Sequence, residues 1–268
     1  MPGTGGRAAA FFDLDKTIIA TSSTLAFSRP FFANGLITRA SVIRSMYAQF
    51  VYLVGGADHD QVERMRRYLT GLTNGWEVET VRQIVADTLH SIVEPLVYDE
   101  ALELIHDHQD HGREVVIVST SGSDVVEPIA ALLGVSRVVA TRLEVREGRY
   151  TGEIEFYAYG VNKAVAIEEL AARDGFDLRE CYAYSDSATD LPMLGVVGHP
   201  NAVNPDKALR KEAVERGWPV LDFTRPIALQ HSRARQARRA TFAVMAVGAG
   251  AAAAGAVAVA ARRTGPRS

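Results

Sequence analysis

The sequence contains a single cysteine, Cys181, so no disulfide can form within the chain and a reducing compartment is expected. It also lacks a long apolar run ahead of its first acidic residues, which argues against a secretory signal peptide. No internal repeat is visible, which argues against solenoid and propeller architectures. These absences together predict a cytoplasmic protein.

The sequence also lacks a large excess of charge of either sign. The 29 basic and 32 acidic residues give a formal net charge of -3. A general nucleic-acid-binding protein usually carries a large basic excess, so no nucleic-acid partner is expected. The 268 residues, 47% of them hydrophobic, are enough to bury the core of one large domain or two smaller ones.

Short apolar runs alternate with helical patterns along most of the chain. The runs predict buried strands at residues 8–12, 114–118, 138–140, 182–184 and one beginning at 196–197. Helices are predicted at residues 99–111, 125–133 and 162–173, and a hairpin at 143–145 and 150–155. This alternation predicts an α/β fold, with a Rossmann-like parallel sheet and helices on both of its faces.

Residues 21–96 break the alternation. Their apolar residues recur at helical spacing over 41–54, 59–72 and 78–93, and no strand pattern is visible. We interpret this segment as a helical insertion in a core made of residues 1–20 and 97–230. Residues 231–268 form a tail.

Polar clusters follow the predicted strands at the points where the strands end. In open parallel sheets, ligands bind outside the carboxyl ends of the strands, so we expect these clusters to converge. The clusters are Asp13-Leu14-Asp15-Lys16-Thr17, Ser119-Thr120-Ser121, Lys163 and the run Ser185-Asp186-Ser187-Ala188-Thr189-Asp190.

Converging carboxylates repel one another, and a hard divalent cation such as Mg²⁺ offsets that repulsion. One carboxylate can then attack a phosphate ester, while a second protonates the leaving alcohol and later activates a water. Ser119 and Lys163 would hold the transferring phosphoryl group. Each cluster alone is also typical of a turn, a helix cap or a solvated lysine, but their order predicts phosphoryl chemistry.

These residues resemble the haloacid dehalogenase superfamily, and among its members most closely the phosphoserine-phosphatase-like hydrolases of subfamily IB. The resemblance covers residues 8–222, and the helical insertion is similar to the type 1 cap of that family. The matching motifs are Asp13-Leu14-Asp15-Lys16-Thr17, Ser119, Lys163 and Asp186 to Asp190.

The resemblance implies a role for each residue. Asp13 would be the nucleophile, and Asp15 the general acid and base. Mg²⁺ would be bound by Asp13, by the backbone carbonyl of Asp15 and by Asp186. Asp190 would orient the site through Lys163 or a metal-bound water. The residues that would bind the substrate phosphate are Ser119, Thr120 and Lys163.

The favoured function is therefore hydrolysis of a small phosphate monoester through an aspartyl phosphate, because superfamily dehalogenases lack the second aspartate. Phosphoserine itself is an alternative substrate, although phosphoserine phosphatases carry a glutamate where this chain has Ser22, and many have an asparagine where it has Thr189. A phosphotransferase or mutase on the same scaffold and a non-catalytic membrane-bound binding protein are rival functions. The cap residues considered for substrate contacts are Arg29, Arg39, Arg44, Tyr47 and Tyr52.

Two further segments attract attention. The run from His106 to His111 resembles a metal cluster, but its spacing fits no usual zinc site, and we interpret it as the solvated end of a helix.

The uncharged run 240–261 has arginines on both sides and is long enough to span a bilayer, although its alanine content makes it only marginally apolar. It predicts anchoring to the inner face of the cell membrane and makes a lipid-related phosphate a candidate substrate. The alternative is an alanine-rich helix, disordered or packed on the body of the protein.

Overall fold

The computed structural model describes residues 7–37 and 71–226, and the structural statements below concern those residues. Their strands form one sheet in the order β4-β3-β2-β1-β5-β6-β7, parallel except for the antiparallel pair β3 and β4. The α/β class predicted from the sequence is thereby confirmed. The strands are β1 (Ala9–Phe12), β2 (Glu114–Gly122), β3 (Arg137–Arg146), β4 (Arg149–Phe156), β5 (Tyr182–Ser185), β6 (His199–Val203) and β7 (Val220–Leu221).

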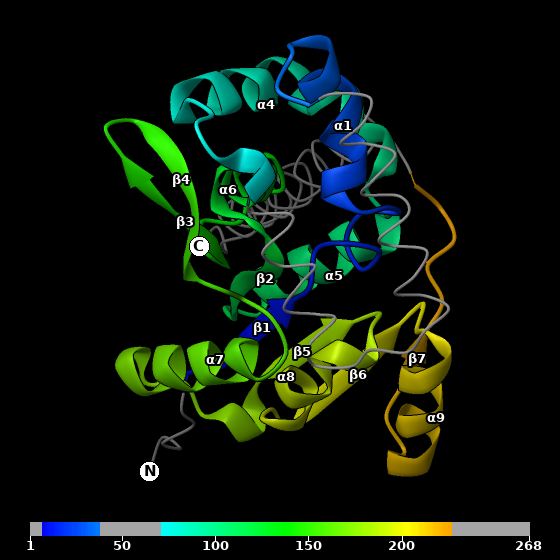
Figure 1. Ribbon diagram of the computed structural model, residues 1–268. Coiled ribbons are helices and arrows are strands. Elements are labelled where there is room, and N and C mark those ends of the chain that lie inside the picture. The colour runs from blue at the N-terminus through cyan, green and yellow to red at the C-terminus, as the bar shows by residue number, and fades with distance from the viewer. Residues whose placement is uncertain (1–6, 38–70, 227–268) are drawn as a thin grey trace, which may run out of the picture. The chain divides into compact units, whose positions relative to one another are not determined.

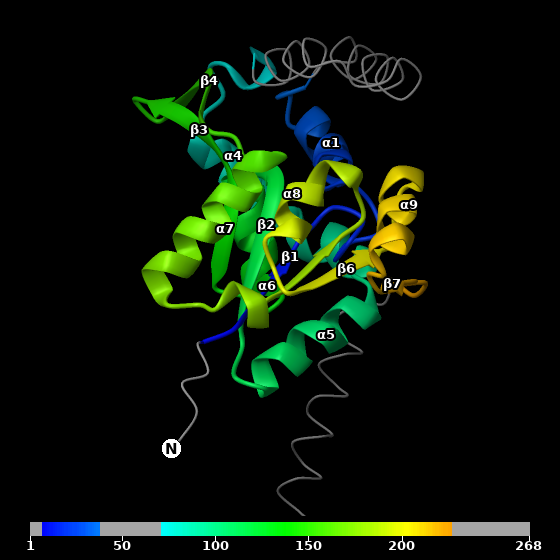
Figure 2. The ribbon, with the colours of Figure 1, turned by 90° about the horizontal axis from the view of Figure 1, so that it is seen from below.

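Helices cover both faces of the sheet. In Figure 1, α7 and α8 lie below the strands and α5 and α6 above them, and Figure 2 shows the same layers from another side. Apolar side chains of β1 and β2, such as Phe11 and Val118, pack with Ile167 of α7. The helices are α1 (Ser23–Ala33), α4 (Val78–Val93), α5 (Asp99–Asp110), α6 (Ser123–Leu132), α7 (Val161–Asp174), α8 (Leu191–Gly195) and α9 (Lys207–Arg216), with short 3-10 turns η1 (Glu94–Leu96), η2 (Leu178–Glu180) and η3 (Ala188–Asp190).

Two strand predictions were wrong in detail. The predicted strand 138–140 and the hairpin arm 143–145 are one strand, β3, whose first half pairs with β2 and whose second half pairs with β4. The predicted strand beginning at 196–197 begins instead at His199, because Val196 keeps a helical backbone at the end of α8. Gly198 then passes so close to the Arg179 carbonyl that a side chain there would collide with it. Short apolar runs do not by themselves distinguish a helix end from a strand.

The two ends of the segment predicted as a helical insertion lie side by side. The Ala20 amide donates to the Leu96 carbonyl at 2.8 Å, and the Tyr98 amide donates to the Ile18 carbonyl at 2.9 Å. Helices α1 and α4 lie within residues 21–96, the range predicted for this insertion, and α4 spans the residues predicted for it. The predicted helices 41–54 and 59–72 fall almost entirely outside the described residues, so the full division into core and cap stays a prediction.

The tail from residue 227 onward, with the predicted membrane segment 240–261, also lies outside the described residues. Within the ranges that the structure covers, no helix combines the length and apolar character that crossing a bilayer requires.

His108 contradicts the expectation of a solvated helix end. Its side chain is only 2% exposed, and its Nε2 lies 2.8 Å from the Tyr184 hydroxyl. On the other side of the ring, Nδ1 lies 3.1 Å from the Arg113 guanidinium, which can only donate, so Nδ1 must accept and the ring must be neutral. Phe12, the residue before Asp13, stacks on Tyr184 at 4.3 Å. His108 therefore supports the strand ends that carry the first polar cluster.

Burial, and then the Arg113 guanidinium, lower the pKa of His108 from 6.5 to about 4. As the pH falls from 6.5 to 4, the unfolded chain takes up this proton before the folded protein does, so the stabilising effect of a neutral His108, present above pH 6.5, is lost. We predict that His108→Gln weakens this acid sensitivity of the free energy of unfolding, by on the order of 2 kcal/mol. Denaturant titrations across this pH range measure it. His111→Gln, at an exposed position on the same segment, is the control, and equal pH dependence in both variants would contradict the prediction.

Candidate active site

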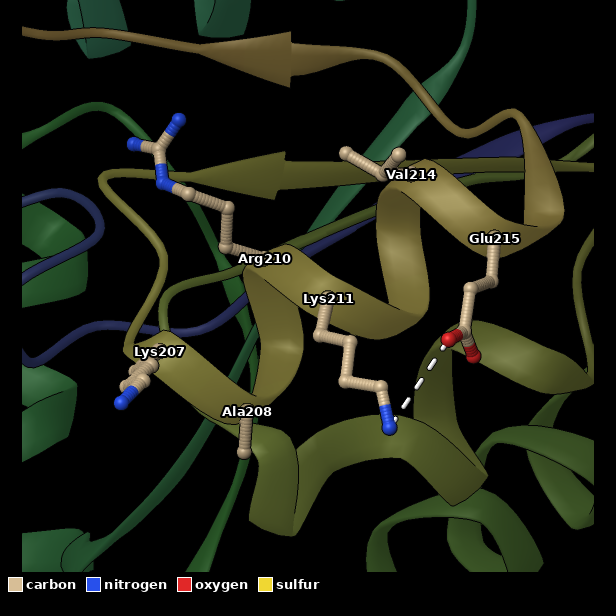
Figure 3. Close-up of a pocket in the computed structure, with 6 residues that line it drawn as sticks. All are labelled: Lys207, Ala208, Arg210, Lys211, Val214 and Glu215. Carbon is tan, nitrogen blue, oxygen red and sulfur yellow. Dashed lines mark ion pairs between the residues drawn. The ribbon is translucent and has the colours of Figure 1, made fainter.

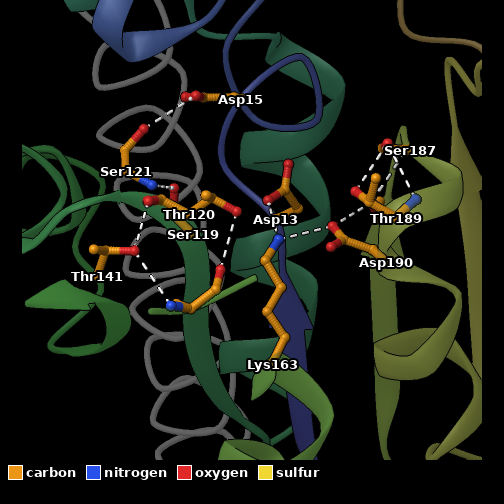
Figure 4. A network of polar contacts seen from close by, with 12 residues as sticks. Asp13, Asp15, Ser119, Thr120, Ser121, Thr141, Lys163, Ser187, Thr189 and Asp190 are labelled. Carbon is orange, nitrogen blue, oxygen red and sulfur yellow. Dashed lines mark hydrogen bonds and ion pairs between the residues drawn. The ribbon is translucent and has the colours of Figure 1, made fainter. Parts of the chain in front are cut away.

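The polar clusters predicted from the sequence meet at the carboxyl ends of three adjacent strands (Figure 4). Asp13 follows β1, Ser119 lies near the end of β2, and Asp190 lies in η3 just after β5. Lys163 reaches the same place from the first turn of α7. All four side chains are buried, Lys163 with only 1% of its surface exposed. The shared site therefore lies inside the protein rather than on an open loop.

Lys163 forms the centre of this network. Its Nζ donates to Asp13 Oδ1 at 2.7 Å and to Asp190 Oδ2 at 2.8 Å, and the Ser185 hydroxyl donates to the same Asp190 oxygen at 2.7 Å. Burial by itself lowers the pKa of Lys163, but the carboxylates of Asp13 and Asp190 outweigh it and raise the pKa above its ordinary value. The lysine is therefore a permanent buried cation.

For Asp13, burial affects the pKa more than the oppositely charged partner does. Burial raises the pKa of its carboxyl well above the ordinary range, and the neighbouring carboxylates of Asp190 and Asp15 act in the same direction, whereas the Lys163 ammonium lowers it. The backbone fixes the position of this group, because the Asp13 amide donates to the Tyr184 carbonyl of β5 at 2.9 Å. Asp13 is therefore a carboxylate in need of a further positive charge.

The local backbone explains how Lys163 arrives there. Gly160, which precedes α7, has a φ of 55°, a conformation that side-chain-bearing residues rarely adopt. A Cβ at this position would lie 3.9 Å from the Thr189 carbonyl of η3, an ordinary contact distance, so the φ angle and not a lack of space favours glycine. The glycine therefore allows α7 to begin directly beside the turn that carries Asp190.

Asp15 lies near Asp13 but is held by different partners. Its Oδ1 accepts a hydrogen bond from the Ser23 amide at the start of α1, at 2.9 Å, and its Oδ2 accepts one from the Ser121 hydroxyl at 3.2 Å. The two serine hydroxyls are themselves 2.7 Å apart. Sequence reasoning missed the roles of Ser23 and Ser121 here, because serines near turns give no distinctive signal.

The two predicted phosphate-binding residues of β2 differ in where they point. Ser119 is buried beside the network and its Oγ accepts the Ser121 amide at 3.2 Å. The Thr120 hydroxyl donates instead to the Ala158 carbonyl at 3.0 Å, and the Thr141 hydroxyl holds the Thr120 carbonyl at 2.7 Å. The structure therefore brings the Ser119 side chain to the site but not the Thr120 hydroxyl.

Asp186 is buried at the end of β5. Burial raises its pKa to about 6; the Lys16 ammonium lowers it, while the Asp190 carboxylate raises it further. In the described part of the chain, no basic side chain forms an ion pair with this carboxylate. Asp206, which sequence reasoning missed, donates its amide to the Asp186 carbonyl at 2.7 Å and so fixes the turn. The carboxylate is left available for a ligand.

The residues present fit a hard cation that accepts few protein ligands. Across the described ranges, no three His, Cys, Asp or Glu side chains are arranged as a metal cluster. The predicted set needs only two carboxylates, those of Asp13 and Asp186, together with the Asp15 backbone carbonyl. Burial raises the pKa of both carboxyls, so a divalent cation would compensate for charges that are otherwise disfavoured. Oxygen donors of this kind suit Mg²⁺.

A second feature of the surface carries no such chemistry. A shallow hollow runs along α9, where Lys211 and Glu215 form an exposed ion pair at 3.8 Å (Figure 3). The hollow is lined by a single helix and shares no residue with the network around Lys163.

The residues considered for substrate contacts are only partly covered. Arg29 is exposed on α1, while Arg39, Arg44, Tyr47 and Tyr52 lie outside the described residues. Ser22, where phosphoserine phosphatases carry a glutamate, is the N-cap residue of α1, and its side chain makes no capping hydrogen bond.

Comparison with known proteins supports the resemblance. A family model described as haloacid dehalogenase-like hydrolase matches residues 10–195. A protein of Streptomyces azureus named for inhibition of morphological differentiation is 61% identical, over 96% of this chain and 94% of its own length. A probable phosphatase of Mycobacterium tuberculosis is 58% identical, over 92% of this chain and 86% of its own.

More distant relatives are named for particular phosphate esters. A phosphoserine phosphatase of Mycobacterium tuberculosis is 35% identical over 81% of this chain and 71% of its own, and a histidinol-phosphatase of Neisseria meningitidis is 32% identical over 80% and 98%. Among solved structures, a protein of unknown function from Bordetella pertussis is 29% identical, with a TM-score of 0.71, covering 81% of this chain and 98% of that one.

The bridging role of Lys163 gives a first test of the site. We predict that Lys163→Met lowers the free energy of unfolding by roughly 3–5 kcal/mol, because it leaves two buried carboxylates without their cation. Adding Asp190→Asn removes one of these charges and should recover part of the loss. Lys211→Met, at an exposed position on α9, is the control. Chemical denaturation measures all three, and a Lys163→Met protein as stable as the wild type would contradict the prediction.

Proposed function

The chain belongs to the haloacid dehalogenase-like hydrolase family and is a phosphatase, and we propose that it hydrolyses a small phosphate monoester through an aspartyl phosphate on Asp13. The observation that carries this proposal is the buried Asp13 carboxylate at the end of the central strand, held through Oδ1 by Lys163. Since Oδ1 is engaged, Oδ2 is the atom that attacks phosphorus.

The first half of the reaction transfers the phosphoryl group to the enzyme. As the bond between Asp13 Oδ2 and phosphorus forms, the bond from phosphorus to the ester oxygen breaks, and the Asp15 carboxyl gives its proton to the departing alcohol. Ser119 and Lys163 stabilise the charge on the transferring group, because fixed donors in a buried site interact strongly with developing charge.

The second half returns the enzyme to its starting state. The Asp15 carboxylate takes a proton from a water molecule whose oxygen attacks phosphorus, and the bond to Asp13 Oδ2 breaks. Inorganic phosphate leaves and Asp15 is protonated again. The same residue thus serves as acid and then as base, two positions along the chain from the nucleophile.

Mg²⁺ is the proposed cofactor, held by the Asp13 and Asp186 carboxylates and the Asp15 carbonyl. When bound, the cation supplies positive charge that reduces repulsion between the substrate phosphate and the attacking carboxylate. Asp190 keeps Lys163 directed at Asp13, so its role is to orient the lysine. For Thr120, whose hydroxyl is bound to Ala158, we propose no side-chain contact with the phosphate.

The substrate is proposed at the level of its class. Two relatives of nearly equal identity to this chain are named for phosphoserine and for histidinol phosphate, so similarity of that degree does not select one ester. Phosphoserine phosphatases bind the amino-acid part of their substrate with a glutamate carboxylate, and Ser22 has only a hydroxyl at that position. We therefore propose a small phosphorylated metabolite, selected by the cap formed by residues 21–96.

We expect Asp13→Asn to lower Mg²⁺-dependent release of phosphate from p-nitrophenyl phosphate by on the order of 10³-fold or more, because the nucleophile is lost. Removing the cation with EDTA should have a similar effect on the wild type, and added Mg²⁺ should restore it. The control is Asp110→Asn, at an exposed position on α5. Phosphate is measured without any acceptor alcohol, so a transferase would release little.

A direct readout of the intermediate accompanies this assay. Wild-type enzyme quenched in acid during turnover should carry phosphate on Asp13, identified by mass spectrometry of the peptide. Covalent phosphate on another residue, or full activity of Asp13→Asn, would sink the proposal.

A further inference from the structure

We propose that Ser121 is a positioning residue that holds the Asp15 carboxyl in the orientation needed for proton transfer. The inference rests on the proposed function, in which Asp15 protonates the leaving group. It concerns a residue to which neither the sequence motifs nor the proposed mechanism assigns a role, and it follows from how the end of β2 is built.

Both oxygens of Asp15 have partners from different elements. Oδ1 is bound by the Ser23 amide of α1 and Oδ2 by the Ser121 hydroxyl of β2. A carboxylate held at only one oxygen could rotate, whereas one held at both oxygens is fixed about its side-chain torsions. Ser121 is the only side chain among the described residues that donates to this carboxylate.

The direction of the hydrogen bonds follows from the chemistry of the groups. When Asp15 is ionised, its carboxylate can only accept, so the Ser121 hydroxyl then donates a hydrogen bond to it. The Ser23 hydroxyl, 2.7 Å from the Ser121 oxygen, must therefore be the donor in that contact. The result is a short chain of hydrogen bonds that runs from Ser23 through Ser121 to Asp15, as Figure 4 shows for its second half.

An irregularity in β2 aims Ser121 at Asp15. The pairing of β2 with β3 shifts register between Ser119 and Gly122, which pair with the consecutive residues Ala140 and Thr141. Bulges of this kind redirect side chains and are common beside active sites. Here the extra residues diverge: the Thr120 hydroxyl binds the Ala158 carbonyl, while Ser121 binds Asp15.

Ser121 also contacts the proposed phosphate-binding serine. Its amide donates to Ser119 Oγ at 3.2 Å, so one residue touches both Asp15 and Ser119. The group that donates the proton and a group that holds the phosphate are thereby fixed relative to one another.

The proposal predicts a dependence on the leaving group. An acidic nitrophenol departs without a proton, so the orientation of Asp15 matters little, whereas a weakly acidic phenol needs the proton. The Ser121→Ala variant should therefore lose roughly 10-fold in kcat/KM on phenyl phosphate and little on dinitrophenyl phosphate. A plot of log kcat/KM against the pKa of the leaving phenol should be steeper than for the wild type.

The experiment compares matched variants over one series of aryl phosphates with Mg²⁺ present. Ser121→Thr keeps the hydroxyl and should restore the wild-type slope. Ser23→Ala removes the second hydroxyl but keeps the amide, and should give an intermediate slope. Ser28→Ala is the control, because its hydroxyl binds only the Leu25 carbonyl of its own helix. If Ser121→Ala does not fold, the slopes measured for Ser23→Ala and Ser121→Thr still test the proposal.

Two results would overturn the inference. A uniform loss across the series would mean that Ser121 contacts the phosphate or only supports the fold, and no loss would mean that Asp15 needs no positioning. Asp15→Asn separates this failure from failure of the proposed function. If Asp15→Asn steepens the slope and Ser121→Ala does not, the inference alone falls. If Asp15→Asn leaves the slope unchanged, the acid role of Asp15 falls, and the inference with it.

Discussion

The site depends on one buried cation shared by two carboxylates. Lys163 is almost fully buried and donates to Asp13 and Asp190 at once, so removing the lysine would leave two buried carboxylates without a cation. The neighbouring positions of β1 and β5, the glycine that opens α7 and the turn after β5 all serve this contact. The fold thus holds three charged groups away from water, where each would be unfavourable without its partner.

Asp13 and Asp15, for which we propose different tasks, lie only two residues apart but in different surroundings. Asp13 is bound by a buried ammonium and lacks enough compensation for its charge. Asp15 is bound by neutral donors, an amide at the start of a helix and a serine hydroxyl. Such a difference in surroundings is what separates a nucleophile from a proton donor when the side chains are identical.

Sequence reasoning predicted the sheet and most of its helices because the spacing of apolar residues, and the turn residues that interrupt it, are local signals. Helix α4, for example, begins and ends where its apolar pattern does. It could place Asp13, Ser119, Lys163 and Asp190 at strand ends because topology brings those ends together. It could not foresee Ser121, because a bulge that turns one serine toward Asp15 leaves no pattern in the residues. It also could not foresee that the Thr120 hydroxyl binds the Ala158 carbonyl, or that His108 is buried against Tyr184, which lies in a distant strand.

The central place of β1 has a consequence for how the protein is made. Ala9 pairs with Glu114 of β2, and Ala10 pairs with Tyr182 of β5. At about 5–20 residues per second, a ribosome needs roughly five to twenty seconds to produce the first of these partners after β1 has been made. The apolar strand at the heart of the enzyme therefore spends that interval without a neighbour. The nascent chain is most open to wrong pairing, or to capture by a chaperone, before the strands that complete the surroundings of Asp13 have been made.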